Sequence, residues 1–435
     1  MADQKVQNRW LVVVGAVLVQ LCLGAIYAWS VFTKKITVPL AEGGEYGFSA
    51  TQAAWIFSAG LATFAIVMVL VGPWAKKEPR KATMLGGFVL GLGYILGGFF
   101  GSSFAAQFIC IGVIGGAGIG IAYVVPIAVG LKWFPDKKGM IAGLGVAGFG
   151  FGATIWVKLA GSWFGGLLNT TSFFGLPGVQ SVFLIYGIIF ALVVLIGSLV
   201  MIDPPEGYLP TGWEPPSAAS GKPGTVDMTS KEMLGTPQYY MLLLMFTGSG
   251  LAGLMVIYCI RLFGIDALQA SGVATAQSAA TIAGTAMAWY AIFNGLGRIV
   301  WGTVSDKIGR KMALFAMCLL QGIIMLLFLK MGGTVIGLIV GASVIGFNFG
   351  GNFSLFPTAT SDFFGTKNLG PNYGWVFLAY AIAGIAGPQV AGFFKDAAAK
   401  SGAGVEAWRQ PFIIASVACL IAAGIALALK PPKKA

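Results

Sequence analysis

A series of apolar runs, each long enough to cross a lipid bilayer, is the feature that most constrains how this chain folds. About 20 apolar residues in a helix span the hydrocarbon core. Only 10% of the 435 residues are charged, against roughly 25% in soluble proteins. We therefore expect an all-α polytopic membrane protein with twelve transmembrane helices. The expected spans are residues 10–32, 52–75, 82–101, 105–131, 140–163, 180–202, 238–262, 280–302, 312–331, 334–358, 373–394 and 409–429.

The expected spans divide into two sets of six. Residues 203–236 between them are rich in Pro, Gly and Ser, a composition typical of a linker. We therefore expect an N-terminal six-helix bundle in residues 1–202 and a C-terminal six-helix bundle in residues 237–435. The halves also repeat a pattern, since Tyr123 and Pro126 correspond to Phe353 and Pro357 at an offset of 230 or 231 residues. Two similar halves are typical of a transporter in which one half rocks against the other.

Lysine and arginine are shared unevenly between the predicted loops. With a cytoplasmic N-terminus, the loops on that side hold 18 of the 27 basic residues and those on the other side hold 7. The positive-inside rule then predicts a multi-pass protein of the cell (inner) membrane with both termini in the cytoplasm. The net charge of +12 is accordingly a topology signal and not the mark of a nucleic-acid partner. The first span is too long for the core of a signal peptide, and we expect it to be retained.

Arg298 lies deep in the span predicted at 280–302, with Asn294 one helical turn before it. A cation in hydrocarbon costs about 2.5–3.5 kcal/mol on insertion scales and therefore marks a functional site by default. Arg298 could neutralise a helix end by extending toward the interface. Alternatively, its planar guanidinium could hold a carboxylate through two parallel hydrogen bonds. Asn294 could orient the guanidinium, bond the substrate or pack between helices.

Several residue types are missing from the predicted spans. The chain has no histidine, and all fifteen acidic residues fall in tails or loops. The five cysteines lie singly, without metal-ligand spacing. We therefore expect no metal site, no cofactor, no enzymatic activity and no carboxylate that carries protons within the membrane. Asp306 should pair with loop arginines or with a helix end.

The stretch Gly302-x-x-x-Asp306-Lys307-x-Gly309-Arg310-Lys311 follows an even-numbered span, and we expect it to form a hydrophilic turn. It resembles the loop motif between helices 8 and 9 of the major facilitator superfamily, which implies a conformational role for Gly302, Asp306, Gly309 and Arg310. Within that superfamily the chain resembles the oxalate–formate antiporter family, which includes bacterial lactate transporters. The residues that carry this resemblance are Asn8-Arg9-Trp10, Tyr27-Ala28-Trp29-Ser30-Val31-Phe32, Lys132 to Gly139, Asn294 to Arg298 and Asn372-Tyr373-Gly374.

Two departures from the related carriers bear on the substrate. The oxalate carrier has a helix 11 lysine that serves as a second cation, and Tyr380 takes that position here. Animal monocarboxylate carriers have an aspartate four residues before the arginine and a lysine in helix 1. The corresponding residues here are Asn294 and Val31. The first departure disfavours oxalate, and the second argues against the same proton relay.

Aromatic residues and a few peripheral cations complete the candidate site. Each aromatic could merely pack in its helix, but the family's cavity positions favour Tyr123, Phe353 and Tyr380. Lys158 is expected to extend to the membrane interface, while Lys34 and Lys35 should lie just outside the first span and attract anions. The full substrate-binding set that we predict is Arg298, Asn294, Tyr123, Tyr380, Phe353, Phe349, Phe377, Tyr27 and Phe149.

These observations together predict a secondary transporter of small monocarboxylates, with L-lactate as the preferred cargo and pyruvate next. The cargo would move with a proton (symport) or in exchange for another carboxylate (antiport). The alternative is an oxalate–formate type antiporter. A nutrient receptor on a transporter fold is disfavoured because no large soluble extension is present. We expect a monomer whose partners are the carboxylate, a proton and the lipid bilayer.

Overall fold

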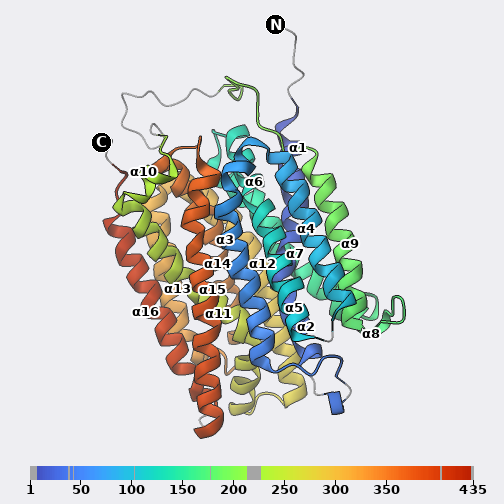
Figure 1. The fold of residues 1–435 in the computed structure, drawn as a ribbon. Coiled ribbons are helices and arrows are strands. Elements are labelled where there is room, and N and C mark those ends of the chain that lie inside the picture. The colour runs from blue at the N-terminus through green and yellow to red at the C-terminus, as the bar shows by residue number, and fades with distance from the viewer. Residues whose placement is uncertain are drawn as a thin grey trace.

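In a computed structural model, all regular secondary structure in the described part of the chain is helical, with no β-strand (Figure 1). The structure describes residues 7–37, 40–42, 44–101, 103–176, 178–212, 227–401 and 404–432. Long helices run side by side along one axis, and short helices lie at their ends. The predicted all-α class is confirmed.

The first six expected spans are all helical. A 3₁₀ stretch, η1, interrupts the first of them and is followed by α2, and a π-helical stretch, η3, occupies part of the fourth. Such irregular turns inside long helices often mark functional positions. The elements are α1 (Arg9–Leu23), η1 (Gly24–Ala28), α2 (Trp29–Ile36), η2 (Leu40–Glu42), α3 (Ala50–Lys77), α4 (Pro79–Phe99), α5 (Phe104–Gln107), η3 (Phe108–Gly115), α6 (Gly116–Trp133), α7 (Lys138–Gly161), η4 (Trp163–Gly165), α8 (Leu167–Thr170) and α9 (Gly178–Ser198).

The second set contains six more long helices, and four of them extend beyond the predicted spans. α11, α12, α14 and α15 continue past the apolar core because polar residues at their ends remain helical, whereas hydropathy detects only the part in lipid. The elements are α10 (Ser230–Leu234), α11 (Pro237–Ala270), α12 (Ala276–Ile308), α13 (Arg310–Met331), α14 (Val335–Phe364), α15 (Leu369–Ser401), η6 (Gly404–Trp408) and α16 (Arg409–Ala428).

Eleven helical segments of the described chain are long and apolar enough to cross a membrane. α12 is not among them, although its 33 residues match their length. It carries Arg298, Asp306 and Lys307 together with many small and polar residues. As α12 packs along both α7 and α14, we count it as the twelfth membrane helix.

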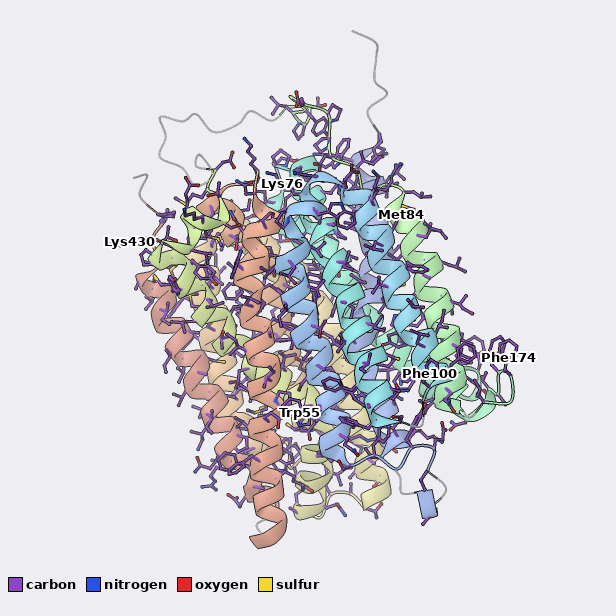
Figure 2. All side chains as sticks on the ribbon, viewed as in Figure 1. Trp55, Lys76, Met84, Phe100, Phe174 and Lys430 are labelled. Carbon is purple, nitrogen blue, oxygen red and sulfur yellow. The ribbon has the colours of Figure 1, made fainter. Side chains whose placement is uncertain are left out.

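The flank of the bundle is apolar. Figure 2 shows side chains such as Met84 projecting outward from the helices, while Lys76 and Lys430 lie near one end. Soluble monomers rarely expose an extended apolar surface, so this belt fits a lipid environment. Large exposed apolar residues include Ile66 (50%), Leu70 (70%), Phe88 (60%), Leu192 (55%), Leu244 (57%), Leu326 (50%), Phe393 (69%) and Ile421 (59%).

The start of α1 and the end of α16 lie at the same end of the bundle, at the top of Figure 1, which we call the terminal end. Helices of the first set pack on one another in the pairs α4–α9, α1–α7 and α3–α6, and those of the second set in α11–α15, α13–α16 and α13–α14. The two sets meet along α7–α12 and α3–α15. These two seams form the interface at which the candidate site lies.

Residues 213–226 of the predicted linker lie outside the described residues. The last part of the linker forms the short helix α10, which was not predicted. A reciprocal capping box of Thr229 and Glu232 starts this helix. Hydrogen bonds from Thr229 lower the pKa of Glu232. Ser230 also donates to Asn372 Oδ1 at 2.9 Å, which attaches α10 to α15.

One local prediction is wrong. The segment from Gly302 to Lys311 was expected to be a hydrophilic turn, but α12 continues through Ile308. Its polar residues remain helical because they have partners: Ser305 donates to the carbonyl of Gly302 at 2.7 Å. The turn is confined to Gly309, whose φ of +84° is readily adopted only by glycine.

Candidate functional site

Arg298 lies at the interface of the two helix sets and is completely buried, with 0% of its surface exposed. Its Nε donates to Asn294 Oδ1 at 3.0 Å, as the i, i+4 spacing on one helix face allows. Its Nη1 donates to the carbonyl of Val146 at 2.9 Å, and Val146 belongs to α7 of the other set. The guanidinium therefore bridges α12 and α7. It does not extend to a helix end, as the alternative interpretation required.

Aromatic rings surround the guanidinium. Its Cζ lies 4.0 Å from the centre of the Phe353 ring and 5.2 Å from that of Phe149. Cation–π contacts of this kind contribute about 0.5–2 kcal/mol each. They stabilise a cation without neutralising it, so the charge of Arg298 remains available to an anion.

Hydrogen-bond donors next to Arg298 are unused. Arg298 Nη2, Asn294 Nδ2 and Tyr123 Oη are all buried and have no hydrogen-bond partner in the described part of the chain. The Tyr123 ring lies 5.5 Å from that of Phe149, which the guanidinium also contacts. Buried polar groups normally have partners, and a carboxylate offers about four acceptor sites. The arrangement is therefore suited to a small carboxylate.

Arg298 has no acidic partner among the described residues. The ion pairs of this part of the chain join other residues. A buried charge without a counter-ion costs several kcal/mol even after relaxation. The protein bears this cost at the centre of its helix interface, where an anionic ligand would offset it.

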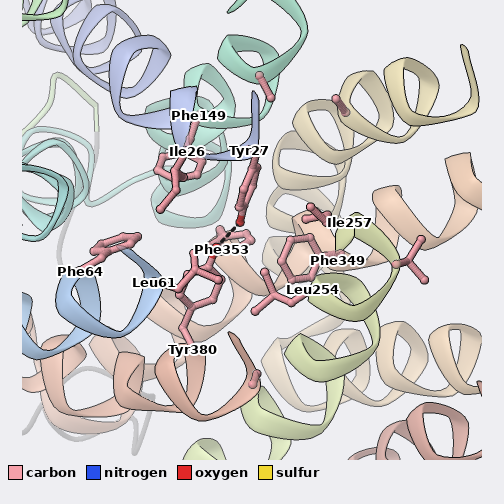
Figure 3. Close-up of a cluster of buried hydrophobic side chains, with 14 of the residues drawn as sticks. Ile26, Tyr27, Leu61, Phe64, Phe149, Leu254, Ile257, Phe349, Phe353 and Tyr380 are labelled. Atoms are coloured by element: carbon pink, nitrogen blue, oxygen red, sulfur yellow. Dashed lines mark hydrogen bonds between the residues drawn. The ribbon is translucent and has the colours of Figure 1, made fainter. Parts of the chain in front are cut away.

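Two tyrosine hydroxyls from opposite halves of the chain meet beside this site. Tyr27 of η1 and Tyr380 of α15 form a hydrogen bond of 2.5 Å, the dashed line of Figure 3. Tyr27 also packs edge-on against Phe149 at 5.0 Å. Gly24 lets η1 approach α7 this closely, since a Cβ there would lie 2.1 Å from the Phe149 carbonyl oxygen.

All nine residues of the predicted binding set lie in one buried cluster. Phe377 stacks on Tyr380 at 4.8 Å and lies 5.2 Å from Tyr123, and Phe349 lies 5.2 Å from Phe353. The prediction missed Phe64 of α3, which lies 4.9 Å from Tyr123 and 4.8 Å from Phe377. It also missed Tyr290. Neither carries a sequence signal, because an aromatic in an apolar helix is usually a packing residue.

A cavity of about 770 Å³ opens between the halves toward the end opposite the terminal end. It reaches Tyr27 at its inner limit. Lys35 and Lys158 line it, so Lys158 faces the cavity between the helix sets, whereas the sequence predicted an interfacial position. The side chain of Lys34 lies outside the described residues.

The terminal end is closed by contacts between α7 and α12. Asp306 accepts hydrogen bonds from the backbone N–H groups of Gly139 and Met140, both at 3.1 Å, at the N-terminus of α7, where the helix dipole favours an anion. Asp306 also pairs with Arg310 at 2.8 Å. Both expected kinds of partner for Asp306 are present. A Cβ on Gly302 would lie 2.2 Å from the Gly139 carbonyl oxygen, so the backbones touch here.

A second acid strengthens this closure. Asp362 of α14 pairs with Arg310 at 2.8 Å and with Lys138 of α7 at 3.5 Å. Arg310 therefore connects two carboxylates, and Lys138 extends the network to the other helix set. The cavity is accordingly open at one end and the helices are in contact at the other.

The model of the Major Facilitator Superfamily matches this chain over residues 10–284 and 275–435. The chain belongs to the major facilitator superfamily. Among solved structures, the proton:xylose symporter XylE aligns with a TM-score of 0.66 at 14% identity, covering 97% of this chain and 95% of that one. The superfamily fold expected from the sequence is confirmed.

The relatives of this superfamily member include carriers of carboxylates. An oxalate:formate antiporter of Oxalobacter formigenes is 27% identical over 98% of this chain and 92% of its own length. The apicoplast pyruvate carrier 1 of Toxoplasma gondii is 25% identical over 85% and 81%. Monocarboxylate transporter 12 of Xenopus laevis is 25% identical over 89% and 82%. The chain is therefore a multi-pass membrane transporter and not an enzyme.

Proposed function

We propose that this transporter moves small monocarboxylates, L-lactate or pyruvate, across the cell inner membrane by alternating access. The observation that carries the proposal is the buried guanidinium of Arg298, which has no acidic partner among the described residues and lies beside unused donors on Asn294 and Tyr123. A bound carboxylate would accept from these donors and neutralise the charge. The aromatic walls exclude water and thereby strengthen the attraction.

Tyr380 supports a monocarboxylate over oxalate. Its hydroxyl bonds Tyr27, where the related oxalate carrier is expected to place a second cation. The second carboxylate of oxalate would therefore be buried without a charged partner, which is costly. The same hydroxyls could instead bond the 2-hydroxyl of lactate or the 2-carbonyl of pyruvate.

Alternating access would use the contacts that close the terminal end. We propose that residues 1–202 and 237–435 move as two bodies within a monomer. The linker at 203–236 and both termini would lie on the cytoplasmic side. The network of Asp306 and Arg310 would hold the cytoplasmic side closed, and Gly302 and Gly309 would allow the close approach and the turn of α12. Breaking that network would open the site inward.

Arg298 also supplies a coupling mechanism. Without cargo, its unpaired charge opposes passage through a closed apolar state, whereas a bound carboxylate neutralises it. Obligatory exchange, including oxalate–formate type antiport, needs nothing further. Symport requires the empty carrier to return, and the proton would then accompany the anion through the tyrosine hydroxyls.

Uptake into proteoliposomes of the purified protein tests the proposal. Labelled L-lactate should accumulate by counterflow against internal lactate or pyruvate and only weakly against internal oxalate. An imposed pH gradient without internal carboxylate should drive uptake only if the carrier is a symporter. Counterflow with oxalate and formate alone would replace monocarboxylate transport by the antiport alternative, and absence of counterflow with every carboxylate would refute the assignment.

A further inference from the structure

Three cations line the cavity that opens at the end opposite the terminal end, which we call the outer cavity. They are Lys35 of α2, Lys158 of α7 and Arg261 of α11, and they come from both helix sets. None of the 26 lining residues is acidic. Arg298 is not among them, so the outer cations are separate from the buried guanidinium.

The side chains of these three cations contact no partner in the part of the chain that the structure describes. Within the described residues, none of them takes part in an ion pair or a hydrogen bond, although each side chain is partly buried. Two other cations at this end of the bundle are paired, Lys395 with Asp266 and Arg409 with Glu406 at 2.7 Å, whereas Lys330 is in no ion pair of the described residues but is exposed to solvent. Among the described side chains at this end, the cavity cations therefore combine partial burial with the lack of an ion-pair partner.

Partly buried like charges that line one cavity without a counter-ion are unfavourable by themselves. Each ammonium or guanidinium loses hydration, and burial lets the cavity walls concentrate the field. An entering anion offsets both costs. As the cavity measures about 770 Å³, a small anion would retain part of its water, and binding there would be weak and quickly reversible.

We propose that Lys35, Lys158 and Arg261 form an outer anion-binding site that holds the carboxylate before it reaches Arg298. That the anion is the transported carboxylate rests on the proposed function, whereas the existence of the site does not. Tyr27 lines the inner limit of the cavity and bonds Tyr380. The substrate would accordingly occupy two positions in series, separated by the tyrosine pair.

Gly284 offers a reporter position for a test that needs no transport. It lines the cavity, and a Cβ built there meets no atom within 4 Å, so Gly284→Cys should be tolerated. The five native cysteines are buried and provide a low background. The protein is placed in phosphatidylcholine nanodiscs, and the rates of modification by the anionic sulfonatoethyl and the cationic trimethylammonioethyl methanethiosulfonates are compared. The ratio of the two rates is insensitive to changes in the accessibility of the thiol and reports the local electrostatic potential.

We expect Lys158→Gln and Arg261→Gln each to lower the anionic-to-cationic ratio about threefold or more, because cavity cations raise local anion concentration by about 10–10³-fold. Lys330→Gln is the matched control. Lys330 is an exposed cation at the same end of the bundle that does not line the cavity, and its replacement should leave the ratio unchanged. Equal ratios in all variants would overturn the proposal.

A second arm separates the outer site from Arg298. Millimolar formate, at constant ionic strength, should slow the anionic reagent at Gly284→Cys equally with and without Arg298→Gln. Protection that disappears with Arg298→Gln would mean a single site and would overturn the proposal. Loss of the ratio effect in phosphatidylglycerol nanodiscs would assign the cations to lipid phosphates and would also overturn it. If wild-type counterflow fails while the ratio falls as expected, the outer site stands and the proposed function does not.

Discussion

Replacing Arg298 by glutamine removes a buried charge and keeps a polar side chain. Loss of one partner from a buried ion pair costs about 3–5 kcal/mol, and each 1.4 kcal/mol is a factor of ten in affinity. Arg298→Gln should therefore weaken carboxylate binding about a hundredfold to a few thousandfold and abolish uptake at micromolar substrate. Arg298→Lys should rescue poorly, because an ammonium cannot reproduce two parallel hydrogen bonds.

The same substitution should have little effect on the stability of the empty protein. Arg298 has no acidic partner among the described residues, so its removal relieves a desolvation penalty and loses hydrogen bonds to Asn294 and Val146. Arg310→Gln is the matched contrast, because it removes one ion pair from each of two carboxylates, Asp306 and Asp362. The thermal midpoint should fall in Arg310→Gln and not in Arg298→Gln. Wild-type affinity in Arg298→Gln, or an equal loss of stability in both variants, would refute a substrate role.

Three further substitutions test the substrate specificity, the tyrosine pair and the closed terminal end. Tyr380→Lys should increase inhibition of lactate uptake by oxalate at least severalfold, because a second cation pairs the second carboxylate; an unchanged ratio of oxalate to lactate affinity would contradict its place in the site. Tyr27→Phe removes the 2.5 Å hydrogen bond of the tyrosine pair that separates the outer site from Arg298. Since this bond contributes about 0.5–1.5 kcal/mol, the variant should accelerate lactate exchange a few fold. Tyr186→Phe, whose hydroxyl donates to a backbone carbonyl at 2.6 Å, should not. Gly302→Ala places a Cβ 2.2 Å from a backbone oxygen of α7 and should shift the carrier toward the inward-open state by about 1–3 kcal/mol, measured as distances between spin labels. Gly424→Ala, with no atom within 4 Å of its Cβ, should leave those distances unchanged.

The helices could be predicted from hydropathy because lipid requires long apolar segments, and this requirement is independent of tertiary contacts. The ends of α11 and α15 could not be predicted from hydropathy, since polar residues beyond the membrane remain helical. The prediction of a turn from Gly302 to Ile308 was wrong for the same reason. This polar segment continues the helix, because nothing in it breaks a helix and Asp306 has partners on another helix.

The buried position of Arg298 could be predicted because an isolated cation in an apolar span has few purely structural explanations. Its neighbours were harder to predict. Phe64 and Tyr290 belong to the cluster only because α3 and α12 bring them there, and an aromatic in an apolar helix gives no sign of which face it occupies. Lys158 shows the opposite case, because its depth along α7 was predicted but its direction into the cavity was not.

The cations of this transporter differ in whether they have partners, and the difference follows their position along the proposed route. At the terminal end, Arg310 and Lys138 pair with acids, so these contacts are satisfied while that end is closed. In the outer cavity and at Arg298, the cations have no acidic partner within the described residues. A pair that is already satisfied holds a conformation, whereas an unsatisfied charge can be completed only by an anion that moves. In the proposed mechanism, the closed end must break its own ion pairs to open, and the substrate supplies the missing charge along the route. We therefore propose that carboxylate binding at Arg298 is the step that can change which end is closed.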